Sequence, residues 1–521
     1  MAVKAIIKTG EYYDSVSLML VGRELTHLEG VEDASAMMAT DANKTILREA
    51  GLWTAEIARA SANDLVIVAK GEESLLAELL FKAESLLKRK QTSTSQTTSG
   101  GYIPRTIWTA KKFVTEANMA IISVAGRYAV DEAWEALKTG LHVLLFSDNV
   151  SLEDEVTLKT YASQHNLLLM GPGAGTAIIN GVALGFANQL PSGPVGIVSA
   201  AGTGLQEVST LLAKNGIGIT QGIGVGGRDL KEEVGGLMML QGLAALIEDA
   251  STNIIILISK PPSPKIIQKI LTEAGKTQKA IIVCFLGIRL AQYDLPVNVR
   301  IVNTLEEAAL VVVSMLKHEN ILDHASIQFQ KTFAAITTSL TKALSPGQRY
   351  LRGLFSGGTL CYEAQVIWRD EYGLNVFSNA PLTTSQKLSD SWLSVGHTAL
   401  DLGEEEFTIG RPHPMIDHEV RIRRILKEAE DPEVAVILLD VVLGYGAHPD
   451  PASELAKAII KGRDIASREH RSLAFISSVT GTDADPQRLS HQVKQLGQAG
   501  VVVCSSNATA ARLTAGIVRY E

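Results

Sequence analysis

The sequence predicts an α/β protein with parallel sheets, preceded by a small N-terminal α+β domain. Strand-length apolar runs alternate with amphipathic stretches along almost all of the 521 residues. Most of these runs are continuously apolar, as expected for strands that helices cover on both faces of a sheet. Apolar residues make up 46% of the chain and charged residues 20%, which supports sizeable cores and excludes a disordered or fibrous chain.

The charge distribution and the lengths of the apolar runs argue against nucleic acid and membranes as binding partners. The 48 Lys and Arg residues and 56 Asp and Glu residues give a net charge of −8, and no segment is a basic tract. Nucleic acid is not expected to bind, because neutralising phosphates needs clustered cations. Runs such as Ile254–Ile258 are too short to span a bilayer, so no membrane association is expected. The sequence predicts a cytoplasmic protein whose thiols (Cys284, Cys361 and Cys504) are reduced.

Residues 1–90 have the pattern of a small α+β domain. Strands are expected at Val3–Ile7, Val31–Met38 and Leu65–Ala69, and helices around Ser15–Arg23, Asn43–Ala50 and Ser74–Lys90. The next segment, Gln91–Gly101, contains no apolar side chain. Because such a composition cannot pack into a core, residues 91–105 are predicted to form a flexible linker.

Three further α/β domains are predicted at residues 106–190, 191–320 and 345–521. The first follows a βαβαβ pattern, with strands at Ala120–Val124, Leu141–Phe146 and Leu167–Met170 and helices at Val130–Thr139 and Leu152–His165. Pro191–Pro194 marks the boundary to the second. The other two domains begin near Val195 and Tyr350.

The last two domains have the pattern of an internal duplication. Three features recur in the same order: a Ser-Gly-Thr turn followed by Glu, a buried strand, and an Asn followed by an Ala-rich helix. These are Gly196–Thr203 with Glu207, Asn253–Ser259 and Asn303–Ala309 in one copy, and Gly353–Thr359 with Glu363, Glu433–Asp440 and Asn507–Ala511 in the other. The second copy carries an inserted loop around Leu382–Pro414.

The two Ser-Gly-Thr turns are candidate anion-binding sites. Each follows a strand and opens a helix, where unpaired amides and the helix dipole favour phosphate or carboxylate. The candidate residues are Ser199, Gly202 and Thr203 in the first turn, Ser356, Gly357, Gly358 and Thr359 in the second, and Lys260 after a strand. Simple helix capping is the alternative for a single turn, but two copies favour a ligand between opposed helix N-termini. A solvated lysine at a strand end is the alternative for Lys260.

Three other segments carry candidate residues. Gly410–Asp417 places Arg411, His413 and Asp417 in a proline-stiffened loop, where Arg411 can clamp an anion and His413 can move a proton. A solvated loop is the alternative. Substrate-binding candidates are Gly226, Gly227 and Asp229 in a glycine-rich turn and Ser147 and Asn149 after a strand; a structural Asx turn and a helix cap are the alternatives. Neither a dinucleotide fingerprint nor a metal-binding pattern is present.

Residues Ala120–Asp229 resemble the α-subunit of succinyl-CoA synthetase. The matching features are the βαβαβ run, the turn Leu169–Pro172, Gly196–Ser199 with Gly202 and Thr203, and Gly226–Asp229. The resemblance implies a Rossmann-like CoA-binding-type domain at 106–190, followed by two flavodoxin-like domains of the succinyl-CoA-synthetase type. However, no histidine lies between His165 and His318, so the phosphohistidine of the synthetases is missing at its expected place after Ala280–Leu286. An ATP-grasp half and the synthetase's CoA loop are also missing from the sequence.

The whole chain resembles the FdrA family of acyl-CoA-synthetase-like proteins more closely. The matching motifs are Asp14–Met19, Phe146–Val150, Val225–Leu230, Ser259–Pro262, Phe355–Thr359 and Gly410–Asp417. The resemblance implies a subunit of oxamate carbamoyltransferase that acts with two other proteins in allantoin (purine) breakdown. Its reaction interconverts oxamate and carbamoyl phosphate with oxalurate and phosphate.

The sequence leaves three functions open. The first is a carbamoyltransferase with carbamoyl phosphate as substrate and no certain cofactor. The second is an acyl-CoA or succinyl-CoA ligase, which would use CoA. The third is a non-catalytic scaffold subunit, favoured by Gly173 and Ala174, since relatives have Asp or Asn and then Cys after the Gly-Pro of this turn.

Overall fold

The computed structural model forms two units, each described by itself. Unit 1 comprises Met1–Arg105 with Glu405–His413, and unit 2 comprises Thr106–Glu404 with Pro414–Glu521. The structure describes residues 2–11, 13, 15–26, 28, 30–40, 43–44, 47–48, 50–73, 83, 85, 104–124, 126–288, 293–319, 333–408 and 411–518. The predicted helix Ser74–Lys90 and the predicted linker Gln91–Gly101 lie almost entirely outside the described residues.

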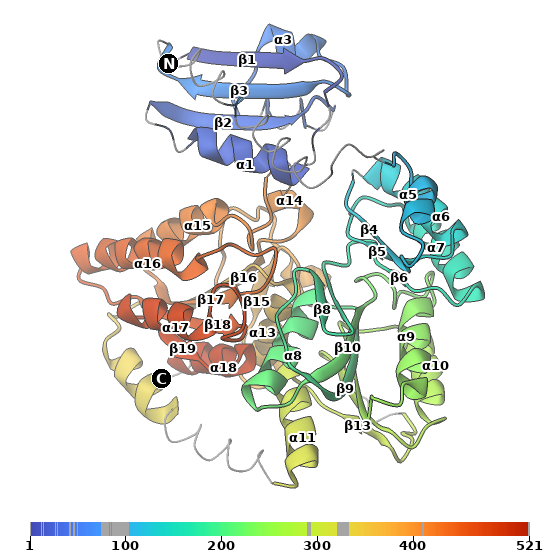
Figure 1. Ribbon diagram of the computed structural model, residues 1–521. Coiled ribbons are helices and arrows are strands. Elements are labelled where there is room, and N and C mark those ends of the chain that lie inside the picture. Colours follow the sequence, from blue (N-terminus) through green and yellow to red (C-terminus); the bar gives the residue numbers. More distant parts are fainter. Residues whose placement is uncertain are drawn as a thin grey trace. The chain divides into compact units, whose positions relative to one another are not determined.

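Unit 1 contains a three-stranded antiparallel sheet in the order β1-β3-β2 (Figure 1). The strands span Ala2–Lys8 (β1), Val31–Met38 (β2) and Leu65–Gly71 (β3), and the three predicted strands are confirmed. Helix α1 (Ser15–Thr26) packs on the sheet through Leu18, Val21 and Leu25. The short helices α3 (Ala55–Arg59) and α14 (Glu405–Thr408) complete the unit.

Unit 2 begins with a small parallel sheet in the order β4-β5-β6. Its elements are α5 (Ile107–Phe113), β4 (Met119–Ile122), α6 (Gly126–Lys138), β5 (His142–Leu145), α7 (Leu152–Gln164) and β6 (Leu169–Met170). This sequence of elements confirms the predicted βαβαβ run. Ser151 begins α7, because its hydroxyl accepts a hydrogen bond from the Asp154 amide.

A seven-stranded sheet follows, in the order β13-β12-β11-β9-β10-β7-β8. Its strands are β7 (Thr176–Ile179), β8 (Val182–Gly185), β9 (Ser192–Ser199), β10 (Ile219–Gly224), β11 (Ile254–Ser259), β12 (Ala280–Phe285) and β13 (Val299–Ile301). The helices are α8 (Gly202–Lys214), α9 (Leu237–Glu248), α10 (Pro264–Ala274) and α11 (Leu305–Lys317). Strands β7 and β8 join this sheet, although their residues precede the boundary predicted at 190. The domain boundaries stay predictions.

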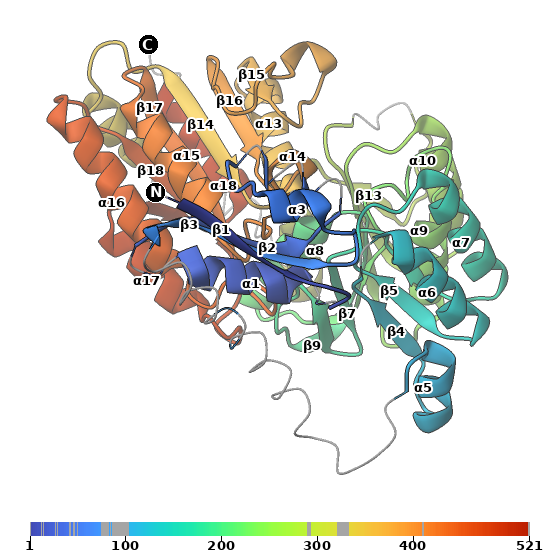
Figure 2. The ribbon, with the colours of Figure 1, turned by 90° about the horizontal axis from the view of Figure 1, so that it is seen from above.

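The second large sheet has six parallel strands in the order β15-β16-β14-β17-β18-β19 (Figure 2). They are β14 (Tyr350–Phe355), β15 (Val376–Ser378), β16 (His397–Asp401), β17 (Val434–Val442), β18 (Ala474–Thr480) and β19 (Val502–Cys504). Its helices are α13 (Gly358–Asp370), α15 (Glu419–Glu430), α16 (Pro451–Arg468), α17 (Leu489–Gln498) and α18 (Asn507–Val518), with a 3₁₀ turn at Thr384–Gln386.

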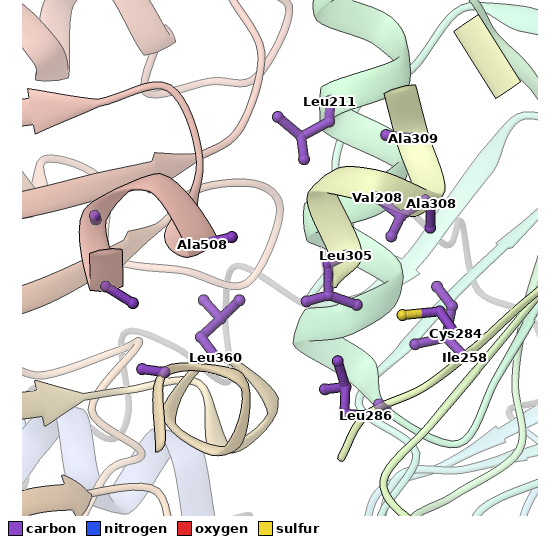
Figure 3. Packing of buried hydrophobic residues seen from close by; sticks show 14 of the residues in the cluster. Val208, Leu211, Ile258, Cys284, Leu286, Leu305, Ala308, Ala309, Leu360 and Ala508 are labelled. Atoms are coloured by element: carbon purple, nitrogen blue, oxygen red, sulfur yellow. The ribbon is translucent and has the colours of Figure 1, made fainter. Parts of the chain in front are cut away.

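The strand orders of the two large sheets support the predicted duplication. The order β13-β12-β11-β9-β10 in one sheet is repeated as β19-β18-β17-β14-β16 in the other. The copies pack through α8 and α11 on one side and α13 and α18 on the other. Figure 3 shows Leu360 and Ala508 facing Leu305 and Val208 across this contact. Apolar burial of this kind stabilises by about 25 cal/mol per Å² and makes the copies one core.

Two of the three cysteines, Cys284 and Cys361, are buried and Cys504 is partly buried; all three are free thiols. Burial raises the pKa of Cys284 and Cys361 well above the usual range, so both stay protonated at neutral pH. Among the helices the structure describes, none is long and apolar enough to span a membrane.

Candidate active site between the duplicated turns

The two Ser-Gly-Thr turns lie side by side where the copies meet. Strand β9 ends at Ser199 before α8, and β14 ends before Ser356 and α13. A Cβ atom added to Gly357 would lie 2.9 Å from Thr203 Cγ2, and one added to Gly204 would lie 3.1 Å from Thr359 Cγ2. The structure thus brings the two predicted turns together. Their role in anion binding stays a prediction.

The second turn is already held by a carboxylate of its own sheet. Asp440, at the carboxyl end of β17, accepts hydrogen bonds from the Ser356 amide (2.8 Å) and the Gly357 amide (2.7 Å). Its carboxylate also pairs with the buried Arg421 guanidinium, Oδ1 to Nη2, at 2.6 Å. Because two amides and a charge partner surround Asp440, this end of the turn has little capacity left for a ligand anion.

The first turn is held by a hydroxyl instead of a carboxylate. The Ser199 hydroxyl accepts from the Ala201 amide and donates to the Ala201 carbonyl. Both α8 and α13 begin without a side-chain cap, and Gly202 and Gly358 are both half-buried. Because the hydroxyl carries no charge, whereas Asp440 does, the amides and dipole at the start of α8 are the better candidate position for an anion.

Asp401 is a site residue that the sequence analysis missed. It ends β16, is 3% exposed, and accepts a hydrogen bond from the Gly403 amide (3.0 Å). A Cβ atom on Gly358 would lie 2.3 Å from Asp401 Oδ2, so only glycine allows this approach to the start of α13. Burial raises the pKa of Asp401 to about 7, although the Lys260 charge opposes the rise. A carboxyl group with such a pKa can exchange a proton near neutral pH.

Lys260 connects the two copies. It follows β11 of the first large sheet, and its ammonium lies 5.6 Å from the centroid of the Tyr362 ring on α13 of the second copy. Its charge also acts on Asp401. The predicted anion-binding lysine therefore lies in the same region as both turns, and its half-buried position leaves it accessible to a small ligand.

The glycine-rich turns predicted to bind substrate form a neighbouring group. A Cβ atom on Gly226 would lie 2.8 Å from the Pro172 carbonyl oxygen, and one on Gly173 would lie 2.6 Å from Asp148 Oδ1. Asn149, Gly173 and Gly227 are exposed at these turns. The carboxyl ends of β5, β6 and β10 therefore meet at a solvent-accessible edge, where α/β proteins commonly bind ligands.

Two of the substrate-binding candidates in this group have structural partners. Asp229 is fully buried; it pairs with Lys159 at 2.8 Å and accepts from the Met238 and Met239 amides at the start of α9. The Ser147 hydroxyl accepts from the Val124 amide at 3.0 Å. These contacts favour the structural alternatives, and the substrate roles of both residues stay predictions.

The predicted loop residues Arg411, His413 and Asp417 fall in two different units. Arg411 and His413 belong to unit 1, and Asp417 belongs to unit 2. Burial lowers the pKa of His413 to about 4, so its imidazole is neutral at pH 7. Asp417 accepts a hydrogen bond from the Glu419 amide at the start of α15 (2.8 Å), as a helix cap does. Their catalytic roles stay predictions.

Family models match three parts of the chain. They describe an AllF heavy metal-associated domain over residues 1–102, a CoA-binding domain over 192–287 and a CoA-ligase domain over 354–517. The CoA-binding match lies within the segment 191–320, whereas the sequence analysis placed the CoA-binding-type domain at 106–190. Fold and family matches together define an α/β protein that contains a CoA-binding domain and a CoA-ligase domain.

The chain belongs to the family of the uncharacterized protein YahF of Escherichia coli, which is FdrA-like. The two are 44% identical over 513 residues, which cover 97% of each. The resemblance to the FdrA family is thereby confirmed. The succinate–CoA ligase α-subunit of Staphylococcus epidermidis is 29% identical over 152 residues, which cover 28% of this chain and 48% of that protein.

Solved structures with a similar fold include acetyl-coenzyme A synthetase 1 of Ca. Korarchaeum cryptofilum. It is 15% identical, with a TM-score of 0.29 over 77% of this chain and 82% of that one. PH0766 of Pyrococcus horikoshii is 15% identical, with a TM-score of 0.33 over 81% and 87% of the two chains.

The heavy metal-associated description of residues 1–102 does not fit thiolate metal binding in this chain. All three cysteines lie later, at positions 284, 361 and 504. Among the described residues of this segment, no group of three His, Cys, Asp or Glu side chains converges as a metal site. The segment contains no cysteine and therefore lacks the thiolate ligands that heavy metals prefer.

Proposed function

We propose that this protein is a carbamoyltransferase subunit of the FdrA type. It would transfer a carbamoyl group between phosphate and the amide nitrogen of a small 2-oxo-amide such as oxamate, in allantoin breakdown. The resemblance to the FdrA family supports the proposal. The observation that carries it is the meeting of the two helix N-termini at Thr203 and Thr359, with Asp401 against Gly358 at the start of α13 and the Lys260 charge acting on Asp401.

In this proposal the phosphate group of carbamoyl phosphate binds at the start of α8, with Lys260 as its counter-charge. The amide nitrogen of the acceptor attacks the carbamoyl carbon, so that a C–N bond forms and the C–O bond to phosphate breaks. Phosphate leaves with the electron pair of that bond. Asp401 takes the proton released by the nitrogen, a role that suits a carboxyl group whose pKa is about 7.

A CoA ligase is the second candidate, favoured by the CoA-binding and CoA-ligase family matches. In synthetases the phosphohistidine follows the strand that corresponds to β12. Here that strand is followed by Gly287, whose added Cβ would lie 3.1 Å from Val366 of α13, and no histidine occurs between His165 and His318. The chain therefore has no histidine at this position that could accept the phosphoryl group.

The test compares the two reactions directly. The purified chain, alone and with the two partner subunits proposed for it, is incubated with carbamoyl phosphate and oxamate, and in parallel with ATP, CoA and succinate. We expect oxalurate and phosphate from the first mixture only. Phosphate release that requires ATP and CoA, with none from carbamoyl phosphate, would support the ligase. Turnover in neither mixture would favour a scaffold subunit, as Gly173 and Ala174 suggest.

Two variants test the assigned residues. Lys260→Met and Asp401→Asn are each expected to lower kcat/KM by at least about 100-fold, the usual cost of losing one charge-stabilising or proton-transferring group. Lys265→Met is the matched control, because Lys265 is a 66% exposed lysine on α10, just beyond the same strand. Equal activities for the Lys260 and Lys265 variants would refute the assignment.

A further inference from the structure

Three ligand-type side chains converge next to β17, away from the turns described above. His418 precedes α15, His448 lies between β17 and α16, and Glu454 is in the first turn of α16. The ligand atoms of the three residues all lie within 4.8 Å of one another. His418 lies 30 residues before His448 in the sequence, and Glu454 lies six residues after it. The sequence analysis predicted no metal site.

His418 is a buried histidine whose ring lacks a well-formed hydrogen bond. It is 3% exposed, and neither Nδ1 nor Nε2 has a partner within ordinary hydrogen-bond geometry, because its interaction with the Pro414 backbone falls outside those limits. Buried polar atoms without well-formed partners are uncommon and costly, so a ring in this state is suited to receive an ion.

His448 and Glu454 already have the spacing of two ligands on one ion. His448 Nε2 lies 3.4 Å from Glu454 Oε1, and the centroids of the His448 and His418 rings are 5.0 Å apart. Two ligand atoms on a tetrahedral ion with bonds of about 2.0–2.1 Å lie about 3.4 Å apart. Since all three ligand atoms lie within 4.8 Å of one another, bringing the His418 ring to the same spacing requires a closure of at most about 1.4 Å.

We propose that His418, His448 and Glu454 bind one divalent metal ion of the zinc type. Two imidazoles and one carboxylate are a common ligand set for zinc, and three protein ligands leave a fourth position for water or a substrate atom. Arg421, one turn after His418 on α15, does not repel the ion at full strength, because its guanidinium pairs with Asp440. Glu454 is 33% exposed at its side chain, which gives the ion an entry path.

Metal binding requires one rearrangement. His448 Nδ1 accepts a hydrogen bond from the Asp450 amide (3.0 Å), so the proton of the neutral ring is on Nε2. Binding through Nε2 moves that proton to Nδ1 and breaks this hydrogen bond, so the Asp450 amide loses its acceptor when the ion binds.

The test uses the full chain after removal of metal with a chelator. Co²⁺ is titrated while the visible absorption of tetrahedral Co²⁺ is followed, and Zn²⁺ is then added as competitor. We expect one Co²⁺ per chain, displaced by Zn²⁺. His418→Gln and His448→Gln are expected to weaken binding by at least about 100-fold, since loss of even an outer-shell partner costs 10–100-fold.

His491→Gln is the matched control, because His491 is an exposed histidine on α17 of the same sheet domain. Circular dichroism verifies that each variant is folded. If a histidine variant does not fold, the Co²⁺ affinity of Glu454→Gln, which preserves the side-chain shape, is compared with that of the wild type instead. Absence of Co²⁺ and Zn²⁺ binding by the wild-type chain, or equal affinities for the wild type and the ligand variants, would overturn the proposal.

Discussion

At the scale of single residues, two arginines of α15 have opposite environments. Arg421 is 1% exposed at its side chain and bonds to the Leu354 carbonyl and to Asp440, which holds the second turn. Arg423 is 59% exposed and pairs only with Glu419 on the same helix. The first ion pair belongs to the architecture of the site, whereas the second is a surface pair of small energetic weight.

This contrast predicts different costs for the same substitution. Arg421→Met should lower the free energy of unfolding by about 3–5 kcal/mol, because it leaves the Asp440 charge buried and unpaired. Arg423→Met should change it by less than about 1 kcal/mol. Urea unfolding followed by circular dichroism measures both. Similar costs for the two variants would contradict the assigned role of Arg421.

The raised pKa of Asp401 predicts a pH dependence of stability. Since its pKa is about 7 in the folded protein and 3.8 ordinarily, the folded state binds this proton more strongly between about pH 4 and pH 7. The free energy of unfolding should therefore fall as pH rises through that window. The contribution is at most about 4 kcal/mol.

Asp401→Asn isolates this contribution, because it removes the titrating group and keeps the side-chain shape. The stability of the wild type relative to the variant should decrease between pH 4 and pH 7 and then level off. Unfolding free energies of both proteins across this range provide the measurement. Parallel pH profiles would show that the Asp401 pKa is not raised.

At the scale of elements, the copies cap one another's helices. Glu207 of α8 accepts a hydrogen bond from the Asn507 amide (2.9 Å), at the first residue of α18 in the other copy. Reciprocally, Glu363 of α13 accepts from the Leu305 amide (2.7 Å), at the first residue of α11. These reciprocal caps explain why a Glu recurs in both copies of the motif, because each Glu caps a helix of the other copy.

Removing one of these caps should weaken the contact between the copies. Glu207→Ala is expected to cost about 1–3 kcal/mol, because a buried helix-terminal amide loses its acceptor. Glu207→Gln, which keeps one acceptor oxygen, should cost less. Glu248→Ala, at an exposed position of α9, should have little effect. Thermal unfolding compares the stabilities of the three variants. Equal stabilities for Glu207→Ala and Glu248→Ala would show that the cap contributes little to the free energy of unfolding.

The duplication itself was predictable from the sequence because its turns, strand and helix recur as local patterns. Asp401, Asp440 and His418 were not predictable in the same way. Asp440 is 84 residues from Ser356 in the chain, and only the parallel order β16-β14-β17 places Asp401 and Asp440 on either side of the α13 turn. His418 and His448 lack the short spacing by which metal ligands are usually found in a sequence.

At the scale of the whole molecule, the two large sheets form cores that include no residue of the first 105. The apolar clusters of unit 2 begin at Ile107, and unit 1 has clusters of its own around Leu65–Ala69. Unit 2 therefore buries its apolar surface in cores of its own, and we expect these cores to be stable without the N-terminal segment.

A chain beginning at residue 104 is accordingly expected to fold. Its circular dichroism should show the helix and strand content of unit 2, and its thermal transition should lie within about 5 °C of the corresponding transition of the full chain. Both proteins are measured at the same concentration. An aggregated or unfolded shortened chain would mean that unit 2 depends on the N-terminal domain for its stability.

The sequence by itself determined the α/β class, the duplicated domains, the paired turns and the family, because these follow from local periodicity, turn composition and motif identity. The tertiary structure alone decided which groups meet at those turns: Asp440 bonds to the second turn, Asp401 lies against Gly358, and the charge of Lys260 acts on Asp401. The physical reason is that local patterns specify helices and strands, whereas the partners of buried charges depend on strand order and on contacts between residues hundreds of positions apart.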